Sequence, residues 1–184
     1  MRLGSHRWRT TRLLAGIVLA AVMSAGTVDE YQVKAAFLYN FAKFVEWPAE
    51  AFRSDKDPLR ICVLGANPFG SSLSDVLRGK TVLGRPIALA DITDPAQAAD
   101  CQIVFINESE RKRVRLILKT LPRTGILTVS ESEGFAAHGG IVNFTRDGGH
   151  LGFEINAGVA SDARLRISSR VLQLAHIVKS GSLD

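Results

Sequence analysis

Apolar residues recur along the chain in two different spacings, which predict helices alternating with short strands. The first helix is expected from Val33 to about Glu46, because apolar residues three or four apart fill a broad arc there. Pro48 ends this largely buried helix, since proline cannot continue it and disfavours helical backbone before it. Two polar residues, Lys34 and Asn40, interrupt the arc. We expect Lys34 to extend its ammonium to water and Asn40 to bond nearby backbone, with a ligand or partner contact as the alternative.

Four short apolar runs predict buried strands. They cover residues 59–64, 86–92, 102–106 and 126–129. Between the first two, Asn67 and Pro68 indicate the start of a helix that continues to about Arg78. Helical spacing of apolar residues from Val114 to Leu121 predicts a second connecting helix. Strands that alternate with helices imply right-handed βαβ units and a mostly parallel sheet.

The pattern changes after residue 140. Apolar runs at 141–145 and 151–155 flank Asp147-Gly148-Gly149, which is a strong hairpin turn signal. A last helix is expected from Ser168 or Ser169, with its inner face formed by Val171, Leu174, Ala175 and Val178. The sequence therefore predicts a single α/β domain. Its mostly parallel sheet carries a C-terminal β-hairpin and has helices on both faces.

Residues 1–26 have the pattern of a secretory signal peptide. Arginines at 2, 7, 9 and 12 precede an apolar run at 13–23, and small residues follow at 24–26. The run is shorter than the roughly 20 residues that span a bilayer. We expect cleavage near Gly26, which leaves residues 27–184 as the exported domain. An uncleaved membrane anchor is the alternative.

The charge of the chain argues against nucleic acid as a partner. The whole sequence has a formal charge of +5, but four of its 23 basic residues lie in residues 1–26 with no acidic residue. The expected exported part therefore has 19 basic and 18 acidic residues, a net charge of about +1. The basic residues between 111 and 119 follow two glutamates and indicate a solvated helix face rather than a nucleic-acid patch.

The chain has two cysteines, Cys62 and Cys101, and both lie in the expected exported part. In an oxidising compartment such a pair favours a disulfide, whereas a metal site would need histidines nearby in the sequence. The bridge would close a loop of about 40 residues, worth about 4 kcal/mol in the chain-entropy treatment. It would also make the first and third strands neighbours, which gives the strand order 2-1-3-4 of doubly wound sheets.

No catalytic constellation emerges from the sequence. The loop at 65–72 resembles a phosphate loop but lacks its lysine, so it leaves at most a weak anion site. No G-x-S-x-G motif occurs, and the histidines after residue 26 have no metal-binding spacing. Asp75, Asp91 and Asp94 lie near the ends of the first and second βα units, where doubly wound folds often bind ligands, but spacing alone does not pair them as acid and base. We predict no enzyme, cofactor or metal site.

Three separated blocks of sequence resemble the YfiR family of periplasmic regulators. They are VKAAFLYNFAKFVEWP at 33–48, LRICVLG at 59–65, and the tail GGIVNF…GHLGFEIN…ARLRISSRVLQLA from residue 139. The resemblance extends from about residue 30 to 178 with the blocks in the same order. It implies an α/β sheet flanked by helices, assembled as a homodimer in the periplasm.

The resemblance also implies a non-enzymatic function. YfiR-type proteins bind the periplasmic domain of an inner-membrane diguanylate cyclase and hold it inactive, which lowers cyclic di-GMP and biofilm formation. This partner is then the protein's sole link to the membrane. Cys62 and Cys101 match a pair that is bridged in relatives. A second pair of some relatives is absent here, because no cysteine lies between Gly140 and Gly152.

A short strip before the last helix is our candidate partner surface. Apolar Leu165 and Ile167 flank Arg166, and we expect this stretch to be exposed. It is a hypothesis from the pattern rather than a site carried over from the family. The alternative function is a periplasmic small-molecule binding or sensory domain that acts on a histidine kinase or a transporter.

Overall fold

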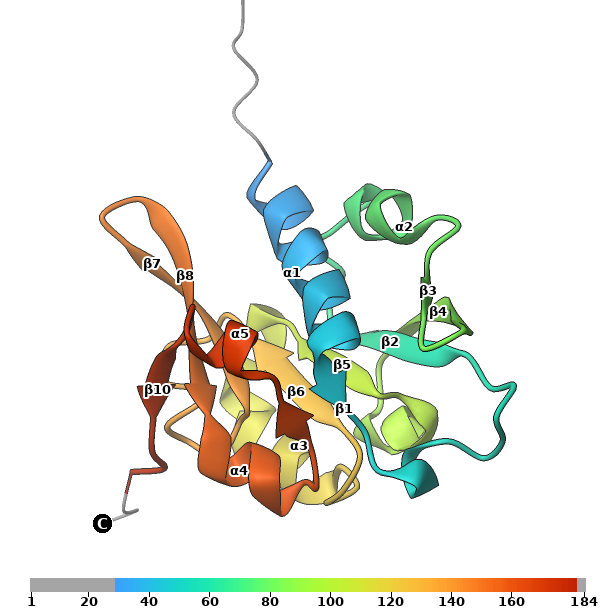
Figure 1. Cartoon of the computed structure of the whole chain (residues 1–184). Helices are drawn as coiled ribbons and strands as arrows, with labels where there is room; N and C mark the ends of the chain where they lie inside the picture. The colour runs from blue at the N-terminus through green and yellow to red at the C-terminus, as the bar shows by residue number, and fades with distance from the viewer. Residues whose placement is uncertain (1–28, 182–184) are drawn as a thin grey trace, which may run out of the picture.

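An eight-stranded sheet runs through the molecule in the order β10-β8-β7-β6-β5-β2-β4-β3 (Figure 1). The structure is a computed structural model, and it describes residues 29–181. The expected signal peptide, residues 1–26, lies outside the described residues. Five central strands, from β4 to β7, are parallel. Strand β3 runs antiparallel to β4 and β8 runs antiparallel to β7, whereas β10 is parallel to β8.

The elements follow one another as the spacing predicts, with several short additions. The strands are β1 Val45–Glu46, β2 Leu59–Leu64, β3 Thr81–Val82, β4 Arg85–Ile92, β5 Ile103–Ile106, β6 Leu127–Ser130, β7 Val142–Asp147, β8 His150–Asn156, β9 Arg166–Ile167 and β10 His176–Val178. The helices are α1 Glu30–Phe44, η1 Ala49–Ala51, α2 Ser72–Leu77, η2 Pro95–Asp100, η3 Glu108–Arg113, α3 Val114–Thr120, α4 Ala157–Asp162 and α5 Ser169–Leu172. Within residues 29–181, none of these helices has the length and apolar character needed to cross a membrane.

The first helix is confirmed as a buried element, although it begins three residues earlier than expected. Asp29 caps it, because its carboxylate accepts a hydrogen bond from the backbone N–H of Tyr31. The apolar arc packs on one face of the sheet, where Phe37 and Phe41 lie 5.3 and 5.4 Å from the Phe153 ring between centroids. After Phe44 the chain becomes extended and forms β1, which pairs with β9.

The predicted strand order and the disulfide are both present. Strand β2 lies between β4 and β5, which is the order 2-1-3-4. Cys62 and Cys101 are bonded, with their Cα atoms 6.0 Å apart. Alternate residues of β2 face two separate cores, as period-two strands require. Ile61 packs in the core beneath α1, while Cys62 and Leu64 pack in the core beneath α3, so helices cover both faces.

The predicted hairpin is formed by β7 and β8. Gly148 and Gly149 form its turn with φ of +54° and +84°, values that suit the two-residue turns typical of hairpins. Phe153 and Ile155 are buried, which confirms the predicted inner face. The hairpin extends beyond the end of β6 and stands beside the start of α1 (Figure 1).

Two predicted helices differ from the structure. Helix α2 begins at Ser72 rather than at Pro68, because the Asn67 side chain accepts a bond from the N–H of Phe69 in a turn and donates to Asp91. The last helix, α5, ends at Leu172. The residues after it form β10 at the sheet edge, since their backbone pairs with β8. Leu174, expected on the inner face, is 72% exposed.

We expect the disulfide to stabilise the fold substantially, because it closes a loop with a sequence separation of 39 residues. Replacing both Cys62 and Cys101 by alanine should lower the free energy of unfolding by about 4 kcal/mol. Urea denaturation of residues 27–184 measures this change. Reductant should destabilise the wild-type protein by a similar amount and leave the double variant unchanged. Equal stability of the oxidised and reduced wild-type protein would contradict the prediction.

Candidate functional site

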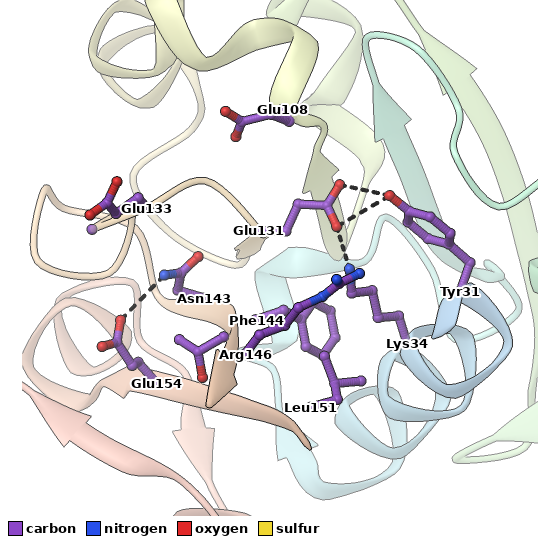
Figure 2. Close-up of a pocket in the computed structure, with 12 residues that line it drawn as sticks. Tyr31, Lys34, Glu108, Glu131, Glu133, Asn143, Phe144, Arg146, Leu151 and Glu154 are labelled. Atoms are coloured by element: carbon purple, nitrogen blue, oxygen red, sulfur yellow. Dashed lines mark hydrogen bonds and ion pairs between the residues drawn. The ribbon is translucent and has the colours of Figure 1, made fainter. Parts of the chain in front are cut away.

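A pocket of about 610 Å³ lies between the start of α1, the β7–β8 hairpin and the loops that follow β5 and β6. Its charged lining consists of Lys34, Glu108, Glu131, Glu133, Arg146 and Glu154, and Phe144 and Leu151 add an apolar wall (Figure 2). A volume of this size is in the range of pockets that hold small molecules.

The topology of the sheet creates the pocket. Strand β6 pairs with β7 at two positions, ending at the pair of Ser130 with Asn143, while β7 continues to Asp147. The outer part of the hairpin therefore projects past the last paired residue of β6. The pocket lies between this projecting part and the loops that follow β5 and β6. Open α/β sheets commonly bind ligands outside the carboxyl ends of their parallel strands, which is the position of Glu108 and Glu131 here.

Lys34 is the centre of a buried ion-pair network at this site. The residue is only 3% exposed. Its ammonium lies 2.6 Å from Oε1 of Glu30 and also pairs with Oε2 of Glu131. The same ammonium stands 4.6 Å from the centroid of the Tyr31 ring, a cation–π contact. The expectation that Lys34 reaches water is wrong, because Glu131, at the end of β6, supplies a buried counter-charge.

Asn40, the other polar residue that interrupts the predicted apolar arc, does not belong to this site. It is exposed on α1. Its polar side chain therefore stays in water rather than lying beside the buried arc.

Tyr31 completes the network. Its hydroxyl donates a hydrogen bond to Oε1 of Glu131 at 3.1 Å. Burial, and then the negative charge of Glu131, raise the pKa of Tyr31 above its usual value, although the charge of Lys34 acts in the opposite direction. The folded protein therefore holds Tyr31 as a neutral hydrogen-bond donor.

Asn143 on β7 lies on the other side of the pocket. Its amide nitrogen donates to Oε2 of Glu154 at 3.3 Å, and the residue is 2% exposed. Within residues 29–181 its Oδ1 accepts no hydrogen bond. A buried acceptor without a donor costs free energy, so this oxygen is unusual in a folded protein.

The candidate catalytic aspartates are not brought together. Asp75 pairs with Arg78, Asp91 accepts from Asn67, and Asp94 caps η2. Across the described part of the chain, no group of three or more His, Cys, Asp or Glu side chains is arranged to hold a metal ion.

The candidate partner strip lies at the opposite end of α1 from the pocket, where β9 pairs with β1. Leu165 is 3% exposed, so the expectation that it faces solvent is wrong: its side chain belongs to the core beneath α1. Arg166 is exposed, with its Nε 3.0 Å from Oε2 of Glu46. Ile167 is half-buried and pairs with Val45. Arg166 and Ile167 are thus the accessible members of the strip.

The pocket network was not predicted as a site. Its one signal in the sequence was Lys34 within an apolar arc, since a buried lysine needs a counter-charge. Glu131 lies 97 residues away and Asn143 looks like an ordinary strand residue, so neither could be assigned before the topology was known.

These features together describe an α/β domain with one disulfide, a ligand-sized pocket at the start of its first helix and a partly exposed strip at the end of that helix. The sequence profile of the YfiR/HmsC-like family matches residues 31–176. The chain belongs to this family, which indicates a periplasmic regulator of diguanylate cyclase signalling. No curated protein matches the sequence.

Removing the charge of Lys34 should destabilise the fold, because the mostly buried carboxylate of Glu131 would then lose its cation, whereas Glu30 would keep Arg146. We expect Lys34→Met to lower the free energy of unfolding by about 3 kcal/mol. Lys43→Met, on the exposed side of the same helix, is the matched control and should change it by about 0.5 kcal/mol or less. Equal losses in urea denaturation of the two variants would contradict the prediction.

Titration of Tyr31 tests the environment of the network directly. The protein has two tyrosines, so a Tyr39→Phe background isolates the ultraviolet signal of Tyr31. Its pKa should lie above 10.0, and adding Glu131→Gln should lower that pKa. Because the folded state holds this proton more tightly, the contribution of Tyr31 to stability is fully present below pH 10 and falls as pH rises above it. An unchanged pKa in the Glu131→Gln variant would contradict this assignment.

Proposed function

We propose that the protein is a non-enzymatic periplasmic repressor that binds the periplasmic domain of an inner-membrane diguanylate cyclase and holds the cyclase inactive. The observation that carries this proposal is the family match over residues 31–176, which spans both the sheet and the strip at β9. Repression would lower cyclic di-GMP and with it biofilm formation. In this proposal the protein is a homodimer and approaches the membrane through its partner.

Repression of this kind is a shift of a population between two states of the cyclase. A bound domain stabilises the inactive state relative to the active state by the difference between its binding free energies for the two states. Moving the cyclase from almost wholly active to almost wholly inactive requires about 10⁴-fold differential affinity, or about 5.5 kcal/mol. A domain whose disulfide ties β2 to the segment just before β5 is suited to this task, because little binding energy is lost in ordering its surface.

The strip supplies the docking surface in this proposal. Arg166 presents a guanidinium beside Glu46, and half-buried Ile167 adds apolar area on the same two-stranded pair. Both residues are fixed by the pairing of β9 with β1, beside the buried side chains of Val45 and Leu165. An arginine beside a small apolar area is a composition enriched at energetically important interface positions.

The first experiment identifies the partner. Tagged protein is purified from periplasmic and membrane fractions, and co-purified proteins are identified by mass spectrometry. Recovery of a membrane diguanylate cyclase, together with a rise in cyclic di-GMP on deletion of this gene, supports the proposal. Sedimentation of residues 27–184 tests the homodimer separately.

Substitutions in the strip should abolish repression without unfolding the domain. Arg166→Asp reverses the exposed charge and Ile167→Glu places a carboxylate in the apolar area. Each variant, returned to the deletion strain, should leave cyclic di-GMP at the level of the deletion. Arg115→Asp, at an exposed position of α3 on the other face of the sheet, is the matched control and should repress normally. Wild-type repression by both strip variants, with normal thermal unfolding, would exclude the strip as the docking surface.

The pocket favours a second candidate function. A volume of about 610 Å³ lined by charged and apolar side chains suits a small-molecule binding or sensory domain. The output would then be a histidine kinase or a transporter instead of a cyclase. Recovery of such a protein in the co-purification, with cyclic di-GMP unchanged on deletion, would select this function and leave the fold as described.

A further inference from the structure

We propose that the pocket binds a small organic cation, namely a primary ammonium attached to a compact apolar body. The inference goes beyond the proposed function, since it concerns a ligand rather than the cyclase. It rests on three features of the pocket: its excess of negative charge, the unpaired buried oxygen of Asn143, and its apolar wall.

The first feature is charge. Four carboxylates line the pocket against two cations, Lys34 and Arg146. Glu30 and Arg111 pair with these residues, and including them gives five carboxylates against three cations. Both lining cations are already engaged, because Lys34 pairs with Glu30 and Glu131 and Arg146 pairs with Glu30. An additional positive charge in this partly desolvated space would therefore be stabilised.

The second feature specifies a hydrogen-bond donor. Asn143 is almost completely buried and its Oδ1 accepts no bond from any described residue. Its amide nitrogen is turned to Glu154, which fixes the oxygen on the opposite side, facing into the pocket (Figure 2). A ligand N–H would satisfy this acceptor. A primary ammonium has three donors and carries the required charge, whereas a quaternary ammonium has the charge alone.

The third feature selects an organic cation over a metal ion. The carboxylates of the pocket are dispersed, and within residues 29–181 no three of them are grouped to ligate a metal. Phe144 and Leu151 instead offer apolar surface beside the charged groups. Burying the body of the ligand against these side chains adds the hydrophobic contribution that a bare cation lacks.

Calorimetric titration of purified residues 27–184 with 2-phenylethylamine tests the proposal. We expect binding at least tenfold tighter than that of 2-phenylethanol or 3-phenylpropionate, which keep the body and remove or reverse the charge. The trimethylated ammonium, which has no N–H, should bind about tenfold more weakly than the amine. Higher salt should weaken the binding of the amine.

Two variants locate the site. Asn143→Leu removes the acceptor and should weaken amine binding about tenfold. Because this position is buried, Glu154→Gln serves as a second variant that removes one charge and leaves Asn143 in place. It should weaken binding about tenfold as well. Glu50→Gln, an exposed carboxylate outside the pocket, is the matched control and should bind like the wild-type protein.

Several results would overturn the proposal. They are an absence of amine binding, equal binding of the alcohol, and equal weakening in the Glu50→Gln and Glu154→Gln variants. Binding of an arginine-containing peptide without any binding of the amine would replace it with a protein-partner site. Since these measurements use the purified domain alone, they neither depend on nor decide whether a cyclase is the partner.

Discussion

The packing of α1 against the sheet determines where both candidate surfaces lie. The aromatic cluster of Phe37, Phe41, Phe144 and Phe153 holds the middle of the helix on the strands of the hairpin. Phe37 and Phe41 each meet Phe153 edge to face, and such pairs contribute about 0.5–1.5 kcal/mol each beyond the area that they bury. With its middle fixed, the helix presents its first turn to the pocket and its end to β9.

At the first turn, this packing brings a lysine into a site that excludes most water. A buried ion pair is a poor source of net stability, because desolvation of both groups opposes their attraction. Its role here is to position the elements. Lys34 joins α1 to the end of β6 through its ion pair with Glu131, and the Tyr31 hydroxyl donates a hydrogen bond to the same carboxylate. The start of the helix and the loop after β6 are thereby held in one geometry, and this geometry defines one wall of the pocket.

Much of the fold could be predicted from the sequence, because its central elements are local patterns. Buried strands such as 59–64 are continuous apolar runs, and the hairpin has a two-glycine turn. The disulfide then ordered the strands. The predictions were wrong where tertiary contacts outweigh local preference: β10 replaces the end of the last helix because an edge of β8 is available for pairing.

The pocket was less predictable than the fold, for a physical reason. The pocket residues Lys34, Glu131 and Asn143 come from α1, the end of β6 and β7, and each is an ordinary polar residue in its own stretch. They form a site because β7 extends beyond the end of β6, which is a consequence of pairing register rather than of composition. The strip at 165–167 is local in sequence and could be proposed from its pattern. Its exposure could not be predicted, because exposure depends on what packs over each side chain.

The antiparallel pairing of β1 with β9 has a consequence for folding during synthesis of the chain. It joins Val45 to Ile167, and the aromatic partners of α1 are likewise near the end of the chain. During synthesis α1 is made early, yet the hairpin strands that cover part of its apolar face are made only after residue 141. A topology so rich in contacts between distant segments folds slowly. Part of the apolar side of the helix therefore lacks its native cover until the hairpin has been made, and transiently exposed apolar surface of this kind promotes aggregation during folding.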